Sequence, residues 1–102
     1  MTVIHQGDQY YLPFRIKHNG DIVTPASITA VRIAIGDETQ EYPDKLSWNE
    51  ENSAFLFLLK SDFTKKMNGV VECQVEIKKG DVKVHSDTFS IKIAKSILVE
   101  DW

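Results

Sequence analysis

Residues 71–78 alternate strictly between apolar and polar side chains. The apolar positions are Val71, Cys73, Val75 and Ile77, and the polar positions between them are Glu72, Gln74, Glu76 and Lys78. A period of two places successive side chains on opposite faces of an extended strand, so this segment is predicted to be a β-strand with one buried and one solvated face. The same alternation recurs in residues 10–17, 31–35 and 89–93. A chain built mainly of β-strands is therefore the first expectation.

Turn residues divide the chain at the spacing of about eight to twelve residues that is typical of sandwiches. Asn19-Gly20-Asp21 and Lys79-Gly80-Asp81 are predicted hairpin turns, because asparagine and glycine adopt the positive φ that such turns need. Pro13 lacks a backbone donor, which favours an edge position or a bulge for its strand.

One short helix is expected near 61–67, with Ser61 or Asp62 capping its first turn and Gly69 ending it after Asn68. Together with the strands and turns, it predicts an all-β, immunoglobulin-like antiparallel β-sandwich of about seven to nine short strands. A small closed barrel is the alternative.

The chain has 102 residues, which is the size of one domain with a single core. It is too small for such a core and a deep catalytic cleft besides. We expect the sandwich to occupy residues 1–95 and an apolar C-terminal tail to occupy residues 96–102.

Composition argues against several function classes. Twelve basic and fifteen acidic side chains give a net charge of −3, and the basic ones form no cluster of the kind that binds nucleic acid. No apolar run approaches the roughly 20 residues that span a bilayer, and residues 1–6 lack the pattern of a signal peptide. A single cysteine, Cys73, on the apolar side of its strand predicts a buried thiol in a chain that folds in a reducing compartment. No nucleic-acid or membrane partner is expected.

Catalysis and metal binding lack the residue spacing that they need. His5, His18 and His85 lie far apart in the sequence, so no metal or other cofactor is expected. Ser86 stands between His85 and Asp87, but neighbouring residues of a strand point to opposite faces and cannot form a hydrogen-bonded relay. The chain is predicted not to be an enzyme.

Some apolar side chains remain after the core is assigned. Leu56 and Leu58 occupy the second face of a strand whose first face is already apolar. The tail supplies further candidates, namely Ile97, Leu98, Val99 and Trp102. A free tail is normally polar, so these six residues are predicted to bind a partner. The tail packs either on its own domain as one more edge strand or on another subunit.

Aromatic side chains suggest an alternative function, that of a small carbohydrate-binding or cell-surface adhesion module. The candidates for stacking on sugars are Tyr10, Tyr11, Tyr42, Trp48 and Trp102. Core packing is expected to account for Tyr10 and Trp48.

A family resemblance covers roughly the first 45 residues. The segments that carry it are Ile4-His5-Gln6-Gly7-Asp8, Asn19-Gly20-Asp21, Ile22-Val23-Thr24-Pro25 and Ala30-Val31-Arg32-Ile33-Ala34-Ile35-Gly36. They resemble small immunoglobulin-like proteins of phages and prophages of Gram-positive bacteria, most of all the N-terminal domain of siphophage upper baseplate proteins.

The resemblance implies a non-enzymatic structural or adaptor protein of a tail or baseplate. Its partners would be phage structural proteins or further copies of itself in a homo-oligomer. Its location would be the virion, or the host cytoplasm during assembly. A host-directed accessory protein is a further possibility.

Overall fold

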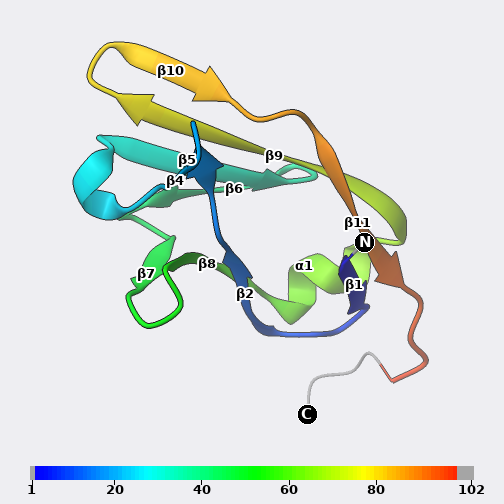
Figure 1. The fold of residues 1–102 in the computed structure, drawn as a ribbon. Coiled ribbons are helices and arrows are strands. Elements are labelled where there is room, and N and C mark those ends of the chain that lie inside the picture. Colours follow the sequence, from blue (N-terminus) through cyan, green and yellow to red (C-terminus); the bar gives the residue numbers. More distant parts are fainter. Residues whose placement is uncertain (1, 99–102) are drawn as a thin grey trace.

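The computed structural model describes residues 2–98 and is mostly β, as expected (Figure 1). The strands of this range are β1 (Thr2–His5), β2 (Tyr10–Phe14), β3 (Lys17–His18), β4 (Asp21–Ile22), β5 (Ala30–Ile35), β6 (Glu38–Tyr42), β7 (Ser47–Asn49), β8 (Ala54–Leu59), β9 (Gly69–Lys79), β10 (Val82–His85) and β11 (Phe89–Ala94). A 3-10 turn at Pro25–Ser27 and one helix, α1 (Ser61–Lys66), complete the described elements. The strands outnumber the expected seven to nine because one expected strand divides into β2 and β3, and several others are only two or three residues long.

The strands form two main sheets and a separate hairpin. The larger sheet has the order β1–β11–β9–β5–β6. In addition, β10 pairs with the C-terminal part of β9, from Glu76 to Lys79. The smaller sheet has the order β2–β8–β7, and β3 pairs with β4. Among the described strands, the pair β1–β11 is parallel and the others are antiparallel, which differs from the expected antiparallel arrangement. The difference arises because the turn after β1 leads the chain to the other sheet, so β1 has no hairpin partner.

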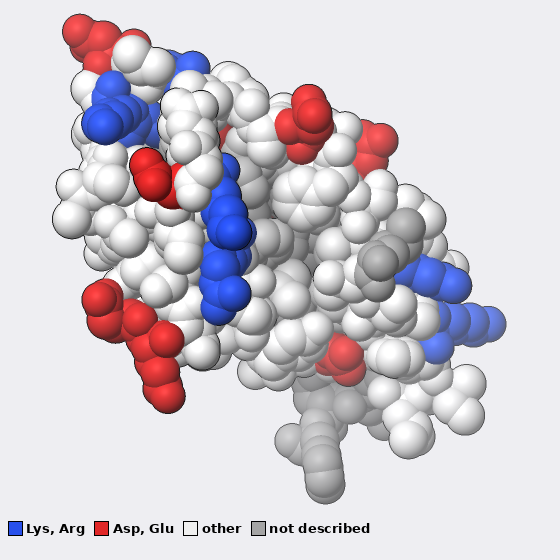
Figure 2. Space-filling model, in the orientation of Figure 1, with Lys and Arg blue, Asp and Glu red and all other residues white. Residues whose placement is uncertain are grey.

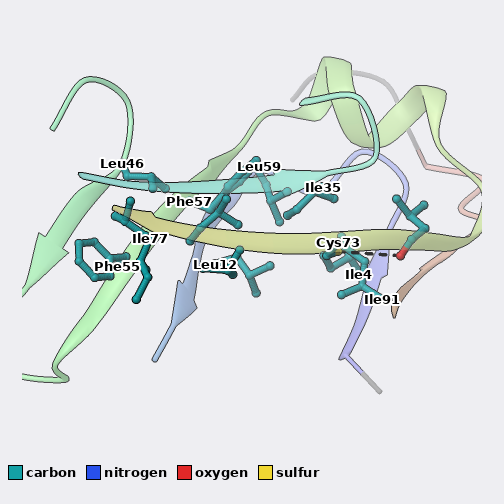
Figure 3. Packing of buried hydrophobic residues seen from close by; sticks show 14 of the residues in the cluster. Ile4, Leu12, Ile35, Leu46, Phe55, Phe57, Leu59, Cys73, Ile77 and Ile91 are labelled. Carbon is teal, nitrogen blue, oxygen red and sulfur yellow. Dashed lines mark hydrogen bonds between the residues drawn. The ribbon is translucent and has the colours of Figure 1, made fainter. Parts of the chain in front are cut away.

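Both main sheets contribute to one hydrophobic core (Figure 3). Phe55, Phe57 and Leu59 of β8 are fully buried, and they face Ile33 and Ile35 of β5 across the interior. The alternation of β9 is confirmed, since each of its four apolar positions in 71–77 is at most 7% exposed. Each large side chain buried in this way contributes about 1.5–3 kcal/mol to stability.

The predicted turns and the position of Pro13 are confirmed. Asn19 and Gly20 have φ of 53° and 86° and connect β3 to β4, while Gly80 has φ of 60° between β9 and β10. Pro13 lies in β2, at the edge of the smaller sheet. Pro13 has no backbone N–H, but no described strand pairs with the outer edge of β2, so no sheet hydrogen bond is lost there.

The helix is confirmed, but the expected cap is wrong. Lys60 is the N-cap of α1, and Ser61 is already the first helical residue. The side chain of Gln9, from the turn before β2, accepts the Ser61 N–H at 3.3 Å. The first turn of α1 is therefore capped by a side chain that is distant in sequence. This is possible because the chain stays extended up to Lys60, which places the start of α1 against the turn between β1 and β2.

A second tertiary contact fixes this turn. Thr64 of α1 is fully buried, and its Oγ1 accepts the Gly7 N–H at 3.0 Å and donates to the Asp8 carbonyl at 2.9 Å. The Asp8 carboxylate in turn accepts the His5 N–H at 2.9 Å. The Gln6-Gly7-Asp8 turn of the resemblance is therefore a structural junction between β1, β2 and α1.

Candidate functional site

Leu56 and Leu58 lie on the outer face of the smaller sheet, opposite the core-facing side of β8. Both are half-buried, and the register places them directly across from Pro13 and Tyr11 of β2. Tyr11 is 55% exposed. We call Tyr11, Pro13, Leu56 and Leu58 the outer patch. It is a row of two apolar cross-strand pairs on a solvated face.

The backbone geometry brings the side chains of the outer patch close together. The N–H and C=O of Leu58 bond to the side chain of Gln40 in β6, at 3.0 and 2.8 Å, so they point away from β2. Tyr11 and Leu58 are therefore a non-hydrogen-bonded pair, the class in which facing side chains are closest. The two predicted leucines belong to a continuous apolar surface that includes β2.

The start of the tail is held in place and its apolar side chains are exposed. The Ser96 N–H donates to Gln6 Oε1 at 3.2 Å, and Gln6 Nε2 donates to the Met67 carbonyl at 2.8 Å. Ile97 is 93% exposed and Leu98 is 88% exposed. Neither belongs to a strand, so packing on the parent domain does not cover these two side chains. Val99 and Trp102, the other predicted tail residues, lie outside the described range.

Sequence reasoning missed a groove between the β3–β4 hairpin and β10. It consists of two adjoining hollows of about 300 and 100 Å³, which share His18, Ile77 and Val84 in their linings. We call this feature the end groove. The apolar residues that line it are Ile16, Ile22, Val23, Ile28, Val75, Ile77, Val82 and Val84. The sequence signal that could have revealed the groove is that Ile22 and Val82 are apolar although each directly follows a polar turn. In the structure these two side chains are 40% and 60% exposed.

Figure 2 looks onto the side where the β2–β3 segment faces the β10–β11 segment, and the surface is hollowed between them. Basic side chains stand in a row beside the hollow. The polar lining of the end groove includes Lys17, His18, Lys79 and His85, with Asp21 as its acid.

A charged cluster occupies the outer face of the larger sheet. Arg32 Nε donates to Glu76 Oε1 at 2.7 Å, and His85 Nε2 lies 2.6 Å from Glu76 Oε2. The register explains the cluster, since Glu76 pairs with Arg32 on one side and with His85 on the other. The hydrogen bond from Arg32, with the charges around it, lowers the pKa of the Glu76 carboxyl. A hollow of about 190 Å³ lies beside these groups, which act as a cross-strand tie.

Ser86 has a structural role next to this cluster. Its Oγ accepts the Val75 N–H at 2.9 Å and donates to the Asp87 carbonyl at 2.9 Å. The hydroxyl closes the bend between β10 and β11 while the neighbouring His85 bonds to Glu76. The geometry thus agrees with the sequence argument that these consecutive residues form no relay.

Cys73 is 2% exposed, and burial raises the pKa of its thiol. Within residues 2–98, no three His, Cys, Asp or Glu side chains come together as a metal site requires. The only described α-helix, α1, is far too short and polar to cross a bilayer.

The aromatic residues divide between core and surface. The rings of Trp48 and Tyr42 pack edge-on against Phe55, with centroid distances of 4.8 and 5.5 Å. Core packing therefore accounts for Trp48, as expected. Tyr10 was also expected in the core but is 38% exposed, because it begins an edge strand and is covered from one side only. Trp102 lies outside the described range.

The chain matches no protein-family model and no curated protein.

Proposed function

We propose that this chain is a non-enzymatic structural or adaptor protein of a phage or prophage particle, associated with the tail or baseplate. It works by docking to other proteins in the virion, or in the host cytoplasm during assembly. The resemblance of roughly the first 45 residues to the N-terminal domain of siphophage upper baseplate proteins supports this role.

The strand order supports the immunoglobulin-like sandwich that the resemblance implies. The sheet β2–β8–β7 corresponds to strands B, E and D of that fold, and β11–β9–β5–β6 corresponds to G, F, C and C′ of its variable type. The described strands pair as separate sheets and not as one continuous ring, which favours a sandwich over a closed barrel.

The main support for the docking role is that apolar side chains outside the hydrophobic core lie exposed or half-buried at the surface. Tyr11 and the two leucines of the outer patch form one such surface, and Ile97 and Leu98 form another. Contiguous apolar surface on a small domain marks contact with another macromolecule. Next to Leu58 the surface becomes polar: this residue also borders a hollow of about 560 Å³ whose lining includes Asp37, Glu38, Gln40, Lys45, Lys60, Asp62 and Lys66.

The experiment is to purify particles produced from a prophage whose copy of this gene carries an epitope tag. We expect the protein in the tail or baseplate fraction by mass spectrometry. Leu58→Asp should remove it from the particles, because the substitution puts a charge into the outer patch. Val70→Asp is the matched control, since Val70 is 64% exposed and lies on β9, outside the patch.

Circular dichroism of both purified variants must show the wild-type fold for the comparison to hold. Tailed particles that lack the wild-type protein would refute the proposal.

The carbohydrate-binding alternative has less support. Two of its five aromatic candidates, Tyr42 and Trp48, are half-buried and pack against Phe55, so only part of each ring is open to solvent. Tyr11 is the most exposed of the described candidates. A single ring is a small platform for sugar stacking.

A further inference from the structure

An open stretch of sheet edge lies beside the end groove. β1 covers the edge of the larger sheet only along β11, from Ile91 to Ala94. Beyond that point the edge strand is β10, which pairs with β9 alone among the described strands. Across the end groove lies β3, whose described ladder partner is β4.

The free edge of β10 presents unpaired backbone groups. Lys79 and Val82 close a two-residue hairpin, and the Ser86 N–H donates to the Val75 carbonyl at 2.8 Å. Alternation along the ladder then turns the N–H and C=O of Lys83 and His85 away from β9. Such an edge is a template for an added strand.

The side chains around this edge favour an apolar segment followed by acidic residues. Val84 and Ile77 form part of the apolar floor, and Lys17 and Lys79 outnumber Asp21 among the charged residues of the lining. The tail of this chain has that composition. It reads Ile97-Leu98-Val99 followed by Glu100-Asp101.

The tail of a given chain is too short to fill its own end groove. Ile93 pairs with Gly69 and His85 pairs with Glu76, so seven residues of β9, or about 23 Å, separate these two levels. Val99 is five residues beyond Ala94, a span of at most about 18 Å. In addition, β1 occupies the intervening edge. The tail can therefore reach an end groove only in another copy.

We propose that the tail of one copy, residues 96–102, adds as a strand to the free edge of β10 in a second copy and packs alternate side chains of the stretch Ile97 to Val99 into the end groove. This inference rests on the proposed docking function and names the partner of the tail. Because donor and acceptor surfaces differ, the contact builds either a closed ring, of which a dimer with exchanged tails is the smallest, or a filament.

The experiment uses the full chain in sedimentation velocity over a range of concentrations. We expect the wild type to form dimers or larger species, and to form fewer of them at high salt. Leu98→Asp should abolish these species by placing a charge on the apolar stretch. Val82→Glu should abolish them from the acceptor side, and Val82→Lys should retain them, since the two variants differ only in the charge that meets the acidic end of the tail.

A mixture of the two deficient variants gives the sharpest result. Leu98→Asp keeps an intact groove and Val82→Glu keeps an intact tail, so the mixture should stop at one-to-one dimers. Val70→Asp is the control for an added surface charge and should assemble like the wild type.

Two outcomes would overturn the inference: a wild type that stays monomeric at hundreds of micromolar, or deficient variants that assemble normally. A monomeric wild type that still enters particles would overturn the inference alone, whereas an assembling wild type that is absent from particles would overturn only the proposed function.

Discussion

Gln40 shows how one side chain can replace a missing strand. β7 covers β8 only from Ala54 to Leu56, which leaves the backbone groups of Leu58 without a ladder partner on that side. The Gln40 amide supplies both a donor and an acceptor there, and it is 5% exposed. Gln40 is therefore buried on β6 because its side chain bonds to the uncovered edge of β8 in the opposite sheet.

Gln40→Leu should lower the free energy of unfolding by about 2 kcal/mol or more, because it leaves the Leu58 N–H and C=O buried without partners. Urea unfolding followed by circular dichroism measures the effect. Gln74→Leu is the matched control: Gln74 makes one bond, to the Ser86 carbonyl at 3.0 Å, near solvent. Equal losses in the two variants would contradict this role for Gln40.

The lowered pKa of Glu76 makes part of the stability depend on pH. The folded state favours the ionised carboxylate, so its contribution is present above the unfolded pKa of about 4.3 and is lost as the pH falls through the folded pKa. Arg32 and His85 are each about half exposed, at 51% and 54%, so solvent screening keeps the effect below about 1 kcal/mol.

Glu76→Gln should therefore be less stable than the wild type at pH 7, and the difference should be smaller at pH 3, below the unfolded pKa. Urea unfolding at these two pH values and at pH 5 measures it. A stability gap that is constant across this range would show that the carboxylate charge contributes nothing.

At the scale of elements, the turn between β5 and β6 is fixed by close approach as well as by backbone conformation. Gly36 has φ of 59°, and a Cβ built on it would lie 2.9 Å from Met67 Cε and 3.2 Å from Val71 Cγ1. The thioether end of Met67 can yield, but the branched Val71 on β9 cannot move without disturbing its strand.

Gly36→Ala should destabilise the protein by about 2–3 kcal/mol through left-handed strain and this contact together. Gly80→Ala has nearly the same φ, 60°, and open space around the new methyl group, so it should cost only about 1–2 kcal/mol. Thermal unfolding of both variants separates packing from backbone strain. If the two losses are equal, Gly36 is needed for its conformation alone.

Elements whose signal is local were predicted well. The alternation of β9, the Asn19-Gly20 turn and α1 all depend on residues adjacent in sequence, and the structure contains each of them. Two features that depend on distant partners were not predicted. They are the cap of α1 by Gln9 and the parallel pairing of β1 with β11.

At the scale of the whole molecule, stability should be distributed unevenly. β9 pairs with β5 from Cys73 to Lys78 on one side and with β11 and β10 along most of the other, and it lies over the core. The β3–β4 hairpin has two residues in each strand, and its strand residues are exposed.

Hydrogen exchange followed by NMR should therefore find the slowest amides in β5 and β9 and much faster ones in β3 and β4. Fast exchange in the hairpin would also leave the mouth of the end groove able to open for an incoming strand. Uniform protection over all these strands would contradict this distribution.

The sequence alone determined the class of the fold, the faces of the longer strands and the surplus of apolar residues, because each of these follows from a short-range period or from composition. Leu56 and Leu58 could be singled out in this way. The tertiary structure decided which surfaces the surplus joins. Tyr11 and Pro13 complete the outer patch only through the β2–β8 register, and the edge of β10 beside the end groove is open because β1 pairs only with β11. Register and strand order are set by contacts between residues far apart in the chain, so no local pattern records them.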